Sequence, residues 1–234
     1  MPIHHNHLFA LLPARERRRL EALCEPVELQ LSSVVCEPGD KLPHVHFPVD
    51  SFISLLAMDA AKSTLEVGMV GREGMLGLHE VLGVAQAPTR ALVQGAGTSL
   101  RMATTDFRSE LRTSATLRAI LLRYVHVSMQ QLASSALCTR FHALRPRLAR
   151  WLLMTQDRAG SDSFQVTQEF LSLMLGMRRV GVTAAALALQ SEGLIEYRRG
   201  DMHVHNRAGL QAAACSCYAS DQAAYQALLS SASP

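Results

Sequence analysis

One stretch decides the fold: residues 167–190, which read TQEFLSLMLGMRRVGVTAAALALQ. Thr167 is a residue type that caps helix N-termini, and Gly176 stands where an apolar segment ends, so the spacing predicts a helix over residues 168–175. A second helix, about residues 178–190, follows at once. Glycine takes the positive φ that a tight turn between two helices requires. The stretch therefore predicts a helix-turn-helix.

The apolar positions indicate which side of the second helix stays exposed. Five residues are expected to face inward: Leu171, Leu175, Met177, Val182 and Ala185. The outer face at the start of the second helix then carries Arg178, Arg179, Val180, Thr183 and Ala184. This is the face that a recognition helix puts into the major groove of DNA.

A basic hairpin is predicted directly after these helices. Residues 194–197 and 202–205 alternate between apolar and polar side chains, and residues 198–201, RRGD, form a Gly-Asp turn between them. Two helices, a glycine turn and a basic hairpin together predict a winged helix-turn-helix. The alternative is an ordinary helical hairpin with solvated arginines.

Seven residues are the candidate DNA contacts: Thr167, Gln168, Arg178, Arg179, Thr183, Arg198 and Arg199. An arginine can make a bidentate contact to guanine or hold a phosphate, and a threonine can touch a base or a thymine methyl group. Of the two arginines that head the second helix, Arg179 is expected to read a base.

The charge distribution favours the same region. Residues 1–139 hold 13 basic and 13 acidic residues, whereas residues 140–207 hold ten arginines, no lysine and six acidic residues, a net charge of +4. Arginine suits bidentate contacts to phosphate and to base edges. The excess is weak evidence for a nucleic-acid partner.

The N-terminal half predicts a β-structure. The 234 residues, 48% hydrophobic and 18% charged, exclude a mostly disordered chain and suffice for two domains. Residues 8–23 are expected to form a short entry helix. Short apolar runs between glycine and proline turns then predict a β-sandwich or roll over residues 27–101. Its expected strands include residues 34–36, 52–56, 65–70 and 91–93.

A long helix is predicted over residues 116–138, which contain no Gly or Pro. One apolar seam recurs at spacings of three and four and is the expected dimer interface: Leu122, Val125, Met129, Leu132 and Ala136. A second apolar face is expected to pack against the roll: Leu117, Ile120, Leu121, Tyr124 and Val127. Two such faces predict a homodimer, and complete burial in a monomer is the alternative.

The compartment follows from two absences in the sequence. No apolar run reaches the ~18–20 residues of a membrane helix, and residues 1–7 are polar and unlike a signal peptide, so we expect a cytoplasmic protein without a membrane partner. The cysteines are odd in number and scattered, so free thiols are expected. They are Cys24, Cys36, Cys138, Cys215 and Cys217.

Several short stretches carry a resemblance to a known family. They are residues 37–39 (EPG), 47–48 (FP), 70–75 (VGREGM), 147–154 (RLARWLLM), 174–179 (MLGMRR), 181–183 (GVT) and 215–218 (CSCY). Together they resemble one branch of the CRP/FNR superfamily of bacterial transcription regulators over nearly the whole chain. The resemblance implies an α+β fold, with a cyclic-nucleotide-binding-like β-roll and a long dimerisation helix in residues 1–138 and a winged helix-turn-helix domain in residues 139–234.

The resemblance also implies a function. It implies a sequence-specific, homodimeric regulator that binds palindromic double-stranded DNA, with RNA polymerase as a further partner. Arg179 occupies the place of a base-reading arginine, whereas Val180 and Ala184 stand where a glutamate and a second arginine are common. Another operator sequence is therefore expected.

Two departures from the family pattern concern the effector. In members that bind cyclic nucleotides, a glycine-glutamate pair grips the ribose, and an arginine followed by Ser/Thr-Ala grips the phosphate. This chain has Gly74-Met75 and Thr89-Arg90-Ala91. The carboxylate is missing, and a one-residue shift along a strand turns the arginine to the opposite face. Control by cyclic AMP is therefore not expected, and the sequence identifies neither a cofactor nor the effector.

The resemblance implies an effector pocket between the roll and the long helix. Its candidate lining residues are Arg72, Gly74, Met75, His79, Thr89, Arg90, Tyr124 and Ser128. Tyr124 and Ser128 are equally compatible with a place in the core or in the dimer interface.

A rival hypothesis is a metal-dependent, cupin-like oxygenase. His44 and His46 share a face if they lie on a strand and could bind a divalent metal, but no third histidine follows at a matching spacing. No nucleophile elbow, phosphate loop or carboxylate pair is present either. The sequence therefore predicts no catalytic residue and no enzyme.

A zinc set can also be drawn from Cys215, Cys217, His203 and His205, but its spacing is unfamiliar. Cysteines at i and i+2 diverge on a helix, so packing thiols are favoured unless the chain is irregular there. Cys24 and Cys36 do not form the clustered set of an iron-sulphur sensor. No metal ligand is expected.

Overall fold

The computed structural model describes residues 6–61 and 63–230. Residues 1–5 of the polar start and residues 231–234 of the expected C-terminal domain lie outside the described residues. The chain forms two compact units. The N-terminal unit comprises residues 1–55, 68–129 and 224–234, and the C-terminal unit comprises residues 56–67 and 130–223.

The chain begins with two short helices, α1 (His7–Ala10) and α2 (Ala14–Ala22). The prediction of one helix over residues 8–23 is therefore wrong. Pro13 lies between the two helices with φ −53° and ψ 143°, and a helix does not adopt this ψ. Proline also disfavours the helical conformation in the residue before it, which ends α1.

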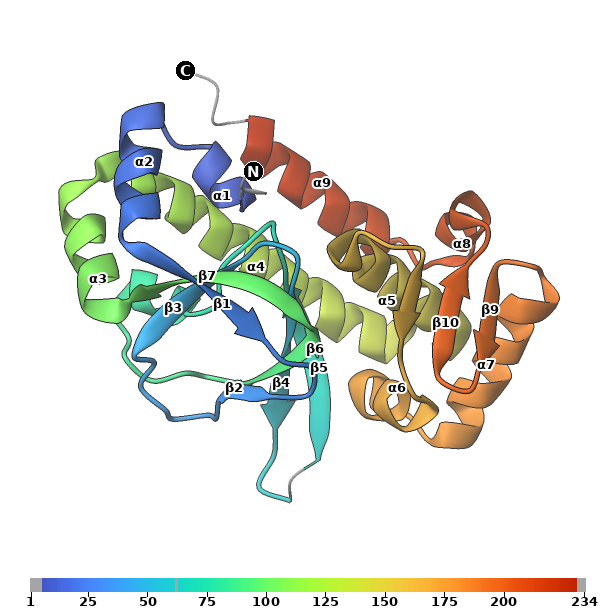
Figure 1. Cartoon of the computed structure of the whole chain (residues 1–234). Coiled ribbons are helices and arrows are strands. Elements are labelled where there is room, and N and C mark those ends of the chain that lie inside the picture. The colour runs from blue at the N-terminus through green and yellow to red at the C-terminus, as the bar shows by residue number, and fades with distance from the viewer. Residues whose placement is uncertain (1–5, 62, 231–234) are drawn as a thin grey trace. The chain divides into compact units, whose positions relative to one another are not determined.

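Seven strands form the roll in two sheets (Figure 1). One sheet has the order β1-β7-β3 and the other β2-β6-β4-β5. The strands are β1 (Cys24–Leu29), β2 (Val34–Cys36), β3 (His44–Pro48), β4 (Phe52–Met58), β5 (Thr64–Val70), β6 (Arg90–Gly95) and β7 (Gly97–Ala103). The four expected strand runs are confirmed as β2, β4, β5 and β6, whereas β1, β3 and β7 were not predicted individually. A 3-10 helix, η1 (Leu78–Leu82), lies between β5 and β6.

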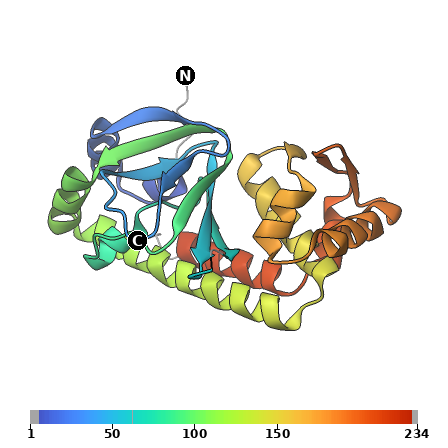
Figure 2. The same cartoon turned by 90° about the horizontal axis from the view of Figure 1, so that it is seen from below.

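Two helices follow the roll, α3 (Thr104–Thr113) and the long α4 (Ala115–Phe141). The predicted second face of α4 is confirmed: Leu117, Ile120, Leu121, Tyr124 and Val127 are buried in one cluster with Val45, Phe47, Met75, Met102 and Phe107. Figure 2 shows the strands of the roll along this part of α4. The long helix thus completes the core of the N-terminal unit.

The seam on the other side of α4 is exposed in the protomer. Leu122, Met129 and Leu132 are 48%, 62% and 50% exposed, Ala136 is exposed and Val125 is half-buried. The alternative of complete burial in a monomer is therefore wrong for the chain as described.

The C-terminal unit contains helices around a small sheet. Its elements are α5 (Leu144–Ala159), β8 (Ser163–Gln165), α6 (Gln168–Leu175), α7 (Arg179–Ser191), β9 (Ile195–Arg198), β10 (Asp201–Val204), α8 (Arg207–Ala213) and the first part of α9 (Cys217–Ser230). The sheet has the order β8-β10-β9. Leu148, Leu152, Leu171, Val182 and Leu189 are fully buried and form part of its core.

In the described part of the chain, no single helix has the length and apolar composition needed to cross a membrane, although α6 and α7, bent by 106° relative to each other, meet those two criteria as a pair.

Candidate nucleic-acid interface

The two central helices meet in the predicted way. The Thr167 side chain accepts a hydrogen bond from the Phe170 backbone N–H at 3.1 Å, so it caps α6 as expected. Gly176 ends α6 with φ +60°. The helices α6 and α7 cross at 106°, within the range of a helix-turn-helix. The prediction of this motif is confirmed.

A side chain of α5 bonds to the turn between α6 and α7. A guanidinium N–H of Arg147 donates to the Leu175 carbonyl oxygen at 2.6 Å, so a buried cation meets the C-terminal end of α6. Leu171, Leu175, Val182 and Ala185 are buried as predicted. Met177 is 40% exposed, so its inward placement is wrong. It lies after the glycine turn and outside both helices, and Met174 is buried in its place.

The start of α7 presents its outer face to solvent. Arg178 is the N-cap residue and Arg179 the first helical residue, and both side chains are exposed. Val180 is 81% exposed. Thr183 is half-buried, and its hydroxyl lies 3.0 Å from two acceptors, Gln168 Oε1 and the Arg179 carbonyl oxygen. The structure thus brings the side chains of Gln168 and Thr183 together, and the Thr183 hydroxyl is bonded within the protein.

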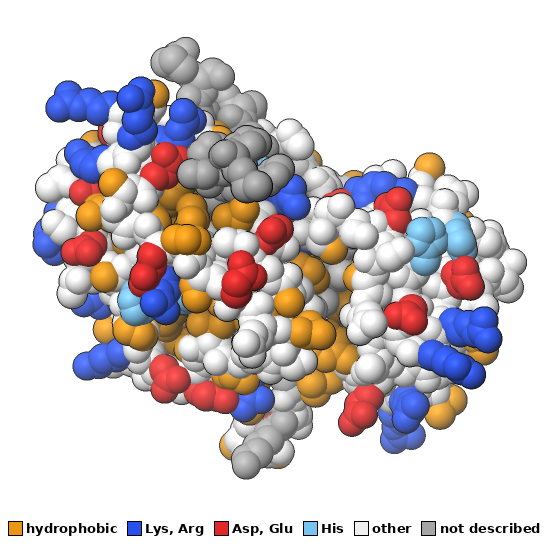
Figure 3. Space-filling view, in the orientation of Figure 1, with side chains coloured by type: hydrophobic (Ala, Val, Ile, Leu, Met, Phe, Trp, Pro, Cys, Tyr) orange, Lys and Arg blue, Asp and Glu red, His pale blue; other side chains and the backbone are white. Residues whose placement is uncertain are grey.

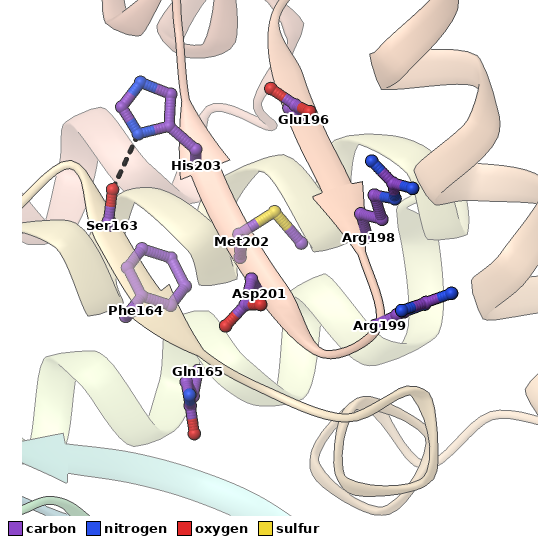
Figure 4. A pocket seen from close by; sticks show the side chains of 9 residues that line it. All are labelled: Ser163, Phe164, Gln165, Glu196, Arg198, Arg199, Asp201, Met202 and His203. Carbon is purple, nitrogen blue, oxygen red and sulfur yellow. Dashed lines mark hydrogen bonds between the residues drawn. The ribbon is translucent and has the colours of Figure 1, made fainter.

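The wing is a hairpin of β9 and β10 whose turn lies one residue earlier than predicted. Arg198 pairs with Asp201, so Arg199 and Gly200, not Gly200 and Asp201, are the two turn residues. Both have positive φ, +52° and +93°, as in a type I′ turn. The turn therefore holds Arg199 at the tip of the wing, and Figure 4 shows the Arg198 and Arg199 side chains at this end of the hairpin.

The wing is tied to the helices behind it. The Tyr197 hydroxyl donates to the Val166 carbonyl oxygen at 2.8 Å, and the Tyr197 backbone N–H donates to Gln190 Oε1 at 3.0 Å. Burial raises the pKa of Tyr197, and the nearby positive charge of Arg179 opposes this shift. Because the charge of Arg179 acts on Tyr197, a residue of β9, Arg179 lies close to the wing.

A shallow depression lies on the sheet of the wing (Figure 4). The Ser163 hydroxyl lies 2.7 Å from His203 Nδ1 at its edge. It is lined by Ser163, Phe164, Gln165, Glu196, Arg198, Arg199, Asp201, Met202 and His203. Its side chains hold no metal-ligand cluster in the described chain.

The ten arginines of residues 140–207 divide into two sets. Six contact other groups of the chain: Arg145 pairs with Glu192, Arg150 with Asp221 and Arg207 with Asp157, Arg147 and Arg158 donate to the carbonyl oxygens of Leu175 and Met154, and the exposed Arg140 lies over the Phe141 ring. Four are exposed and make no ion pair with any described residue: Arg178, Arg179, Arg198 and Arg199. Figure 3 shows Lys and Arg side chains gathered over the region of α7 and the β9–β10 turn. Four of the ten arginines are therefore exposed on the predicted contact face without a side-chain partner among the described residues.

The candidate effector residues are largely packed or paired. A Cβ atom on Gly74 would lie 1.8 Å from the Tyr124 hydroxyl oxygen, so the tyrosine occupies the space beside this glycine. Met75 is 1% exposed and belongs to the core. Arg90 donates to both carboxylate oxygens of Glu37, at 2.8 and 2.7 Å. The structure thus brings Gly74 and Tyr124 together but directs Arg90 to Glu37.

The remaining effector candidates are partly buried: Arg72, His79, Thr89 and Ser128. Burial lowers the pKa of His79, with smaller and opposing effects of Glu80 and Arg108. Burial thus disfavours the charged form of His79, which an anionic ligand would need.

The histidine pair of the oxygenase hypothesis lies on β3. His46 is 8% exposed, and burial, followed by the positive charges of His44 and Arg101, lowers its pKa to about 4. No group of three or more potential metal ligands includes His44 or His46 in the described chain. The oxygenase hypothesis therefore lacks a metal site.

The zinc set drawn from the sequence is wrong in its histidines. His203 bonds to Ser163, and His205 Nε2 lies 3.2 Å from a carboxylate oxygen of Glu196. Cys215 and Cys217 instead lie beside Cys138 and His142. The argument that the two cysteines diverge on a helix also fails, because α9 begins at Cys217 and Cys215 precedes it. Sequence spacing alone gave no signal for this grouping.

Comparison with known proteins agrees with the geometry. Residues 146–213 match the model of the Crp-like helix-turn-helix domain. No curated protein sequence matches the chain significantly. Among solved structures, FixK2 from Bradyrhizobium japonicum is similar, with 11% identity, a TM-score of 0.70 and coverage of 82% of this chain and 98% of that one.

Two further structures are similar in fold. A CRP-family transcriptional regulator from Thermus thermophilus has 15% identity and a TM-score of 0.66 over 80% of this chain and 96% of its own. The c-di-GMP responsive global regulator CLP from Xanthomonas campestris has 16% identity and a TM-score of 0.62 over 82% and 99%. The chain therefore contains a Crp-like helix-turn-helix domain within the α+β fold of the CRP/FNR regulators. This confirms the resemblance and the fold class predicted from the sequence.

Proposed function

We propose that this chain is a sequence-specific transcription regulator that acts as a homodimer on palindromic double-stranded DNA. The observation that carries the proposal is the set of four exposed arginines, without ion-pair partners among the described residues, at the start of α7 and on the wing: Arg178, Arg179, Arg198 and Arg199. The family match of residues 146–213 supports it. A helix-turn-helix places the start of its second helix in the major groove, where these guanidinium groups meet bases and phosphates.

We assign different roles to the two ends of this face. Arg179 reads a base, because the first turn of α7 enters the groove and arginine bonds guanine through two acceptors. Arg199 holds phosphate, because it extends from the tip of the wing. Arg178 and Arg198 add charge beside them, and Thr167, Gln168 and Thr183 complete the contact face.

The homodimer is supported by the exposed seam of α4. Leu122, Met129 and Leu132 expose about half or more of their surface, and their spacing is that of a coiled-coil seam. A two-fold dimer would place two recognition helices about 34–36 Å apart, one turn of DNA. A two-fold symmetric dimer therefore predicts a palindromic DNA site, and the two claims are tested together.

In this proposal residues 1–138 form the effector-binding-like roll with the dimerisation helix, and residues 139–234 form the DNA-binding domain. Cyclic AMP is not the effector, because Met75 replaces the ribose-binding carboxylate and Arg90 is paired with Glu37. The proposed compartment is the cytoplasm, and RNA polymerase is a further proposed partner.

The DNA experiment is selection of bound duplexes from random DNA, followed by salt titration of two variants. Arg179→Ala is expected to lose ~1–3 kcal/mol per half-site and to relax the preferred sequence. Arg199→Ala is expected to weaken all sequences alike and to reduce the salt dependence. Arg18→Ala, an exposed arginine of α2, is the matched control and leaves binding unchanged. Failure to select any duplex would contradict the proposal.

The dimer is tested by light scattering. Leu132→Glu puts a charge into the seam and is expected to give a monomer. Leu82→Glu changes a leucine of η1 that is 59% exposed, and this control should stay dimeric. A monomeric wild-type protein at micromolar concentration would refute the dimer.

A further inference from the structure

Three cysteines and a histidine form a compact cluster in the C-terminal unit. One ligand atom from each of Cys138, His142, Cys215 and Cys217 lies within 4.8 Å of all the others. The three cysteines are buried and the histidine is half-buried. The DNA-binding proposal assigns no role to any of them.

Local structure explains why these side chains converge. Cys138 lies in the last turn of α4, and the His142 backbone N–H bonds to the Cys138 carbonyl oxygen at 3.2 Å, so the two side chains project from the same side of one turn. Cys215 lies in the extended segment before α9, and its backbone N–H bonds to the Pro146 carbonyl oxygen at 3.3 Å. Cys217 begins α9.

Two of the distances between ligand atoms are close to those of a tetrahedral metal site. Cys138 Sγ lies 3.5 Å from Cys215 Sγ, and Cys217 Sγ lies 3.6 Å from His142 Nδ1. Ligands bound tetrahedrally to one zinc ion, with Zn–S near 2.3 Å and Zn–N near 2.0–2.1 Å, stand about 3.8 Å apart for two sulphurs and about 3.6 Å for sulphur and nitrogen. The observed distances agree with both values to a few tenths of an ångström.

A helix N-terminus and a buried cation lie beside the cluster. Cys217 lies at the N-terminal end of the 14-residue α9, where the helix dipole stabilises negative charge. The Arg150 guanidinium lies close enough to act electrostatically on Cys138, Cys215 and Cys217. Arg150 is held in place by an ion pair of 2.7 Å with Asp221 on α9.

Two other chemistries fit less well. A disulfide between Cys138 and Cys215 needs sulphurs near 2.05 Å apart and would leave Cys217 and His142 outside the bond. In an iron-sulphur cluster the ligands bind different iron atoms and stand farther apart than ligands of a single ion. A closed set of three sulphurs and one imidazole is typical of structural zinc.

We propose that Cys138, His142, Cys215 and Cys217 bind one structural zinc ion in the C-terminal unit. The ion joins the end of α4 to the start of α9. Residues 143–214, which contain both helices of the motif and the wing, lie between the two pairs of ligands along the chain, so the ion closes the segment that carries the DNA-binding domain.

The primary experiment is metal analysis of the full-length protein, purified without chelators from cells supplied with both zinc and iron. About one zinc per chain is expected in the wild type, and loss of the zinc is expected in Cys217→Ser. Cys24→Ser and Cys36→Ser, in the N-terminal unit, are matched controls that keep the zinc. No metal in the wild type, an iron-sulphur absorption spectrum, or equal zinc in Cys217→Ser would overturn the proposal.

A second measurement does not depend on a variant that folds. Zinc is removed from the wild type with a chelator, and Co²⁺ is added. A sulphur-to-cobalt charge-transfer band with the visible bands of tetrahedral Co²⁺ is expected, and a spectrum of hydrated octahedral Co²⁺ would refute the site. Mass analysis of the purified protein, denatured and alkylated with a chelator present and without reductant, is expected to find five thiols, and a Cys138–Cys215 disulfide would overturn the proposal.

Discussion

The candidate binding residues of the two units differ in their surroundings: those of the roll are packed or paired, whereas those of the DNA-binding face are exposed. At the candidate effector positions of the roll, Tyr124 fills the space beside Gly74, Met75 is buried in the core, and Arg90 is paired with Glu37. On the helix-turn-helix and the wing, arginines are exposed without ion-pair partners among the described residues. The difference shows that a fold alone does not define a binding site, because binding depends on the side chains that the fold carries.

The same contrast divides the arginines within the C-terminal unit. Arg150 has a side chain only 10% exposed and pairs with Asp221, so its charge is used inside the protein. Arg179 and Arg199 are exposed. A count of ten arginines therefore overstates the charge offered to DNA, because three of them pair with carboxylates and two more donate to carbonyl oxygens within the protein.

The largest expected effect breaks the internal set. Asp221→Ala leaves the buried Arg150 guanidinium without its carboxylate partner, so the free energy of unfolding should fall by about 3–5 kcal/mol in urea denaturation. Arg199→Ala, on the exposed wing, is the control and should stay within about 0.5 kcal/mol of wild type. Equal losses in the two variants would show that the two sets of arginines do not differ.

The next effect tests the buried polar group of the roll. Burial lowers the pKa of His46 to about 4 in the folded protein, against an ordinary value of 6.5 for an imidazole in water. Because the folded pKa is depressed, the unfolded chain binds more protons between pH 6.5 and 4, so stability falls as the pH falls through this window. The loss from this group is at most about 3 kcal/mol.

The measurement is the free energy of unfolding from pH 7 to pH 4 for wild type and His46→Gln. The variant should lose the His46 part of the slope. His7 and His79, whose pKa values burial also lowers, leave a smaller slope in both proteins. The same slope in both proteins would mean that His46 titrates normally.

How far the sequence predicts this structure depends on the range of the interaction. Thr167 and Gly176 act on backbone groups within a few residues, so the bounds of α6 were predicted correctly. Met177 was placed wrongly, because one helical periodicity was continued through a turn that resets it. Strand β1 contains Pro26 and two glutamates, and its hydrogen bonds go to β7, about 70 residues later, so its own sequence gives little signal.

The candidate sites follow the same rule. The arginines of α7 and the wing are adjacent in sequence and were identified from local pattern. Cys138 and Cys215 are 77 residues apart, and their grouping depends on the packing of α4 against the segment before α9. Likewise, the partner of Arg90 is Glu37, 53 residues away, which no local pattern indicates.

A smaller effect sharpens the C-terminal side of the comparison. Thr167→Ala removes the side-chain acceptor for the Phe170 backbone N–H, so thermal or urea unfolding should report a loss of about 1 kcal/mol. Thr167→Ser keeps the oxygen and should recover most of the loss. If both variants lose the same stability, the capping bond is not the cause.

The smallest expected effect concerns the roll. Arg90 and Glu37 have side chains 33% and 44% exposed, so their ion pair contributes only about 0–1 kcal/mol and Glu37→Gln should unfold almost as the wild type does. The variant nevertheless releases the Arg90 guanidinium. It therefore separates two reasons why we expect no cyclic nucleotide to bind: an arginine already paired, or a pocket already filled.

Calorimetric titration with cyclic AMP and cyclic GMP decides between these reasons. Neither the wild type nor Glu37→Gln is expected to give heat beyond dilution, because a free Arg90 does not restore the carboxylate missing at Met75 or empty the space that Tyr124 takes beside Gly74. Micromolar binding by Glu37→Gln alone would assign the loss to the ion pair. Micromolar binding by the wild type would refute the contrast between a closed roll and an open DNA-binding face, because the packed positions would then have to rearrange around a ligand.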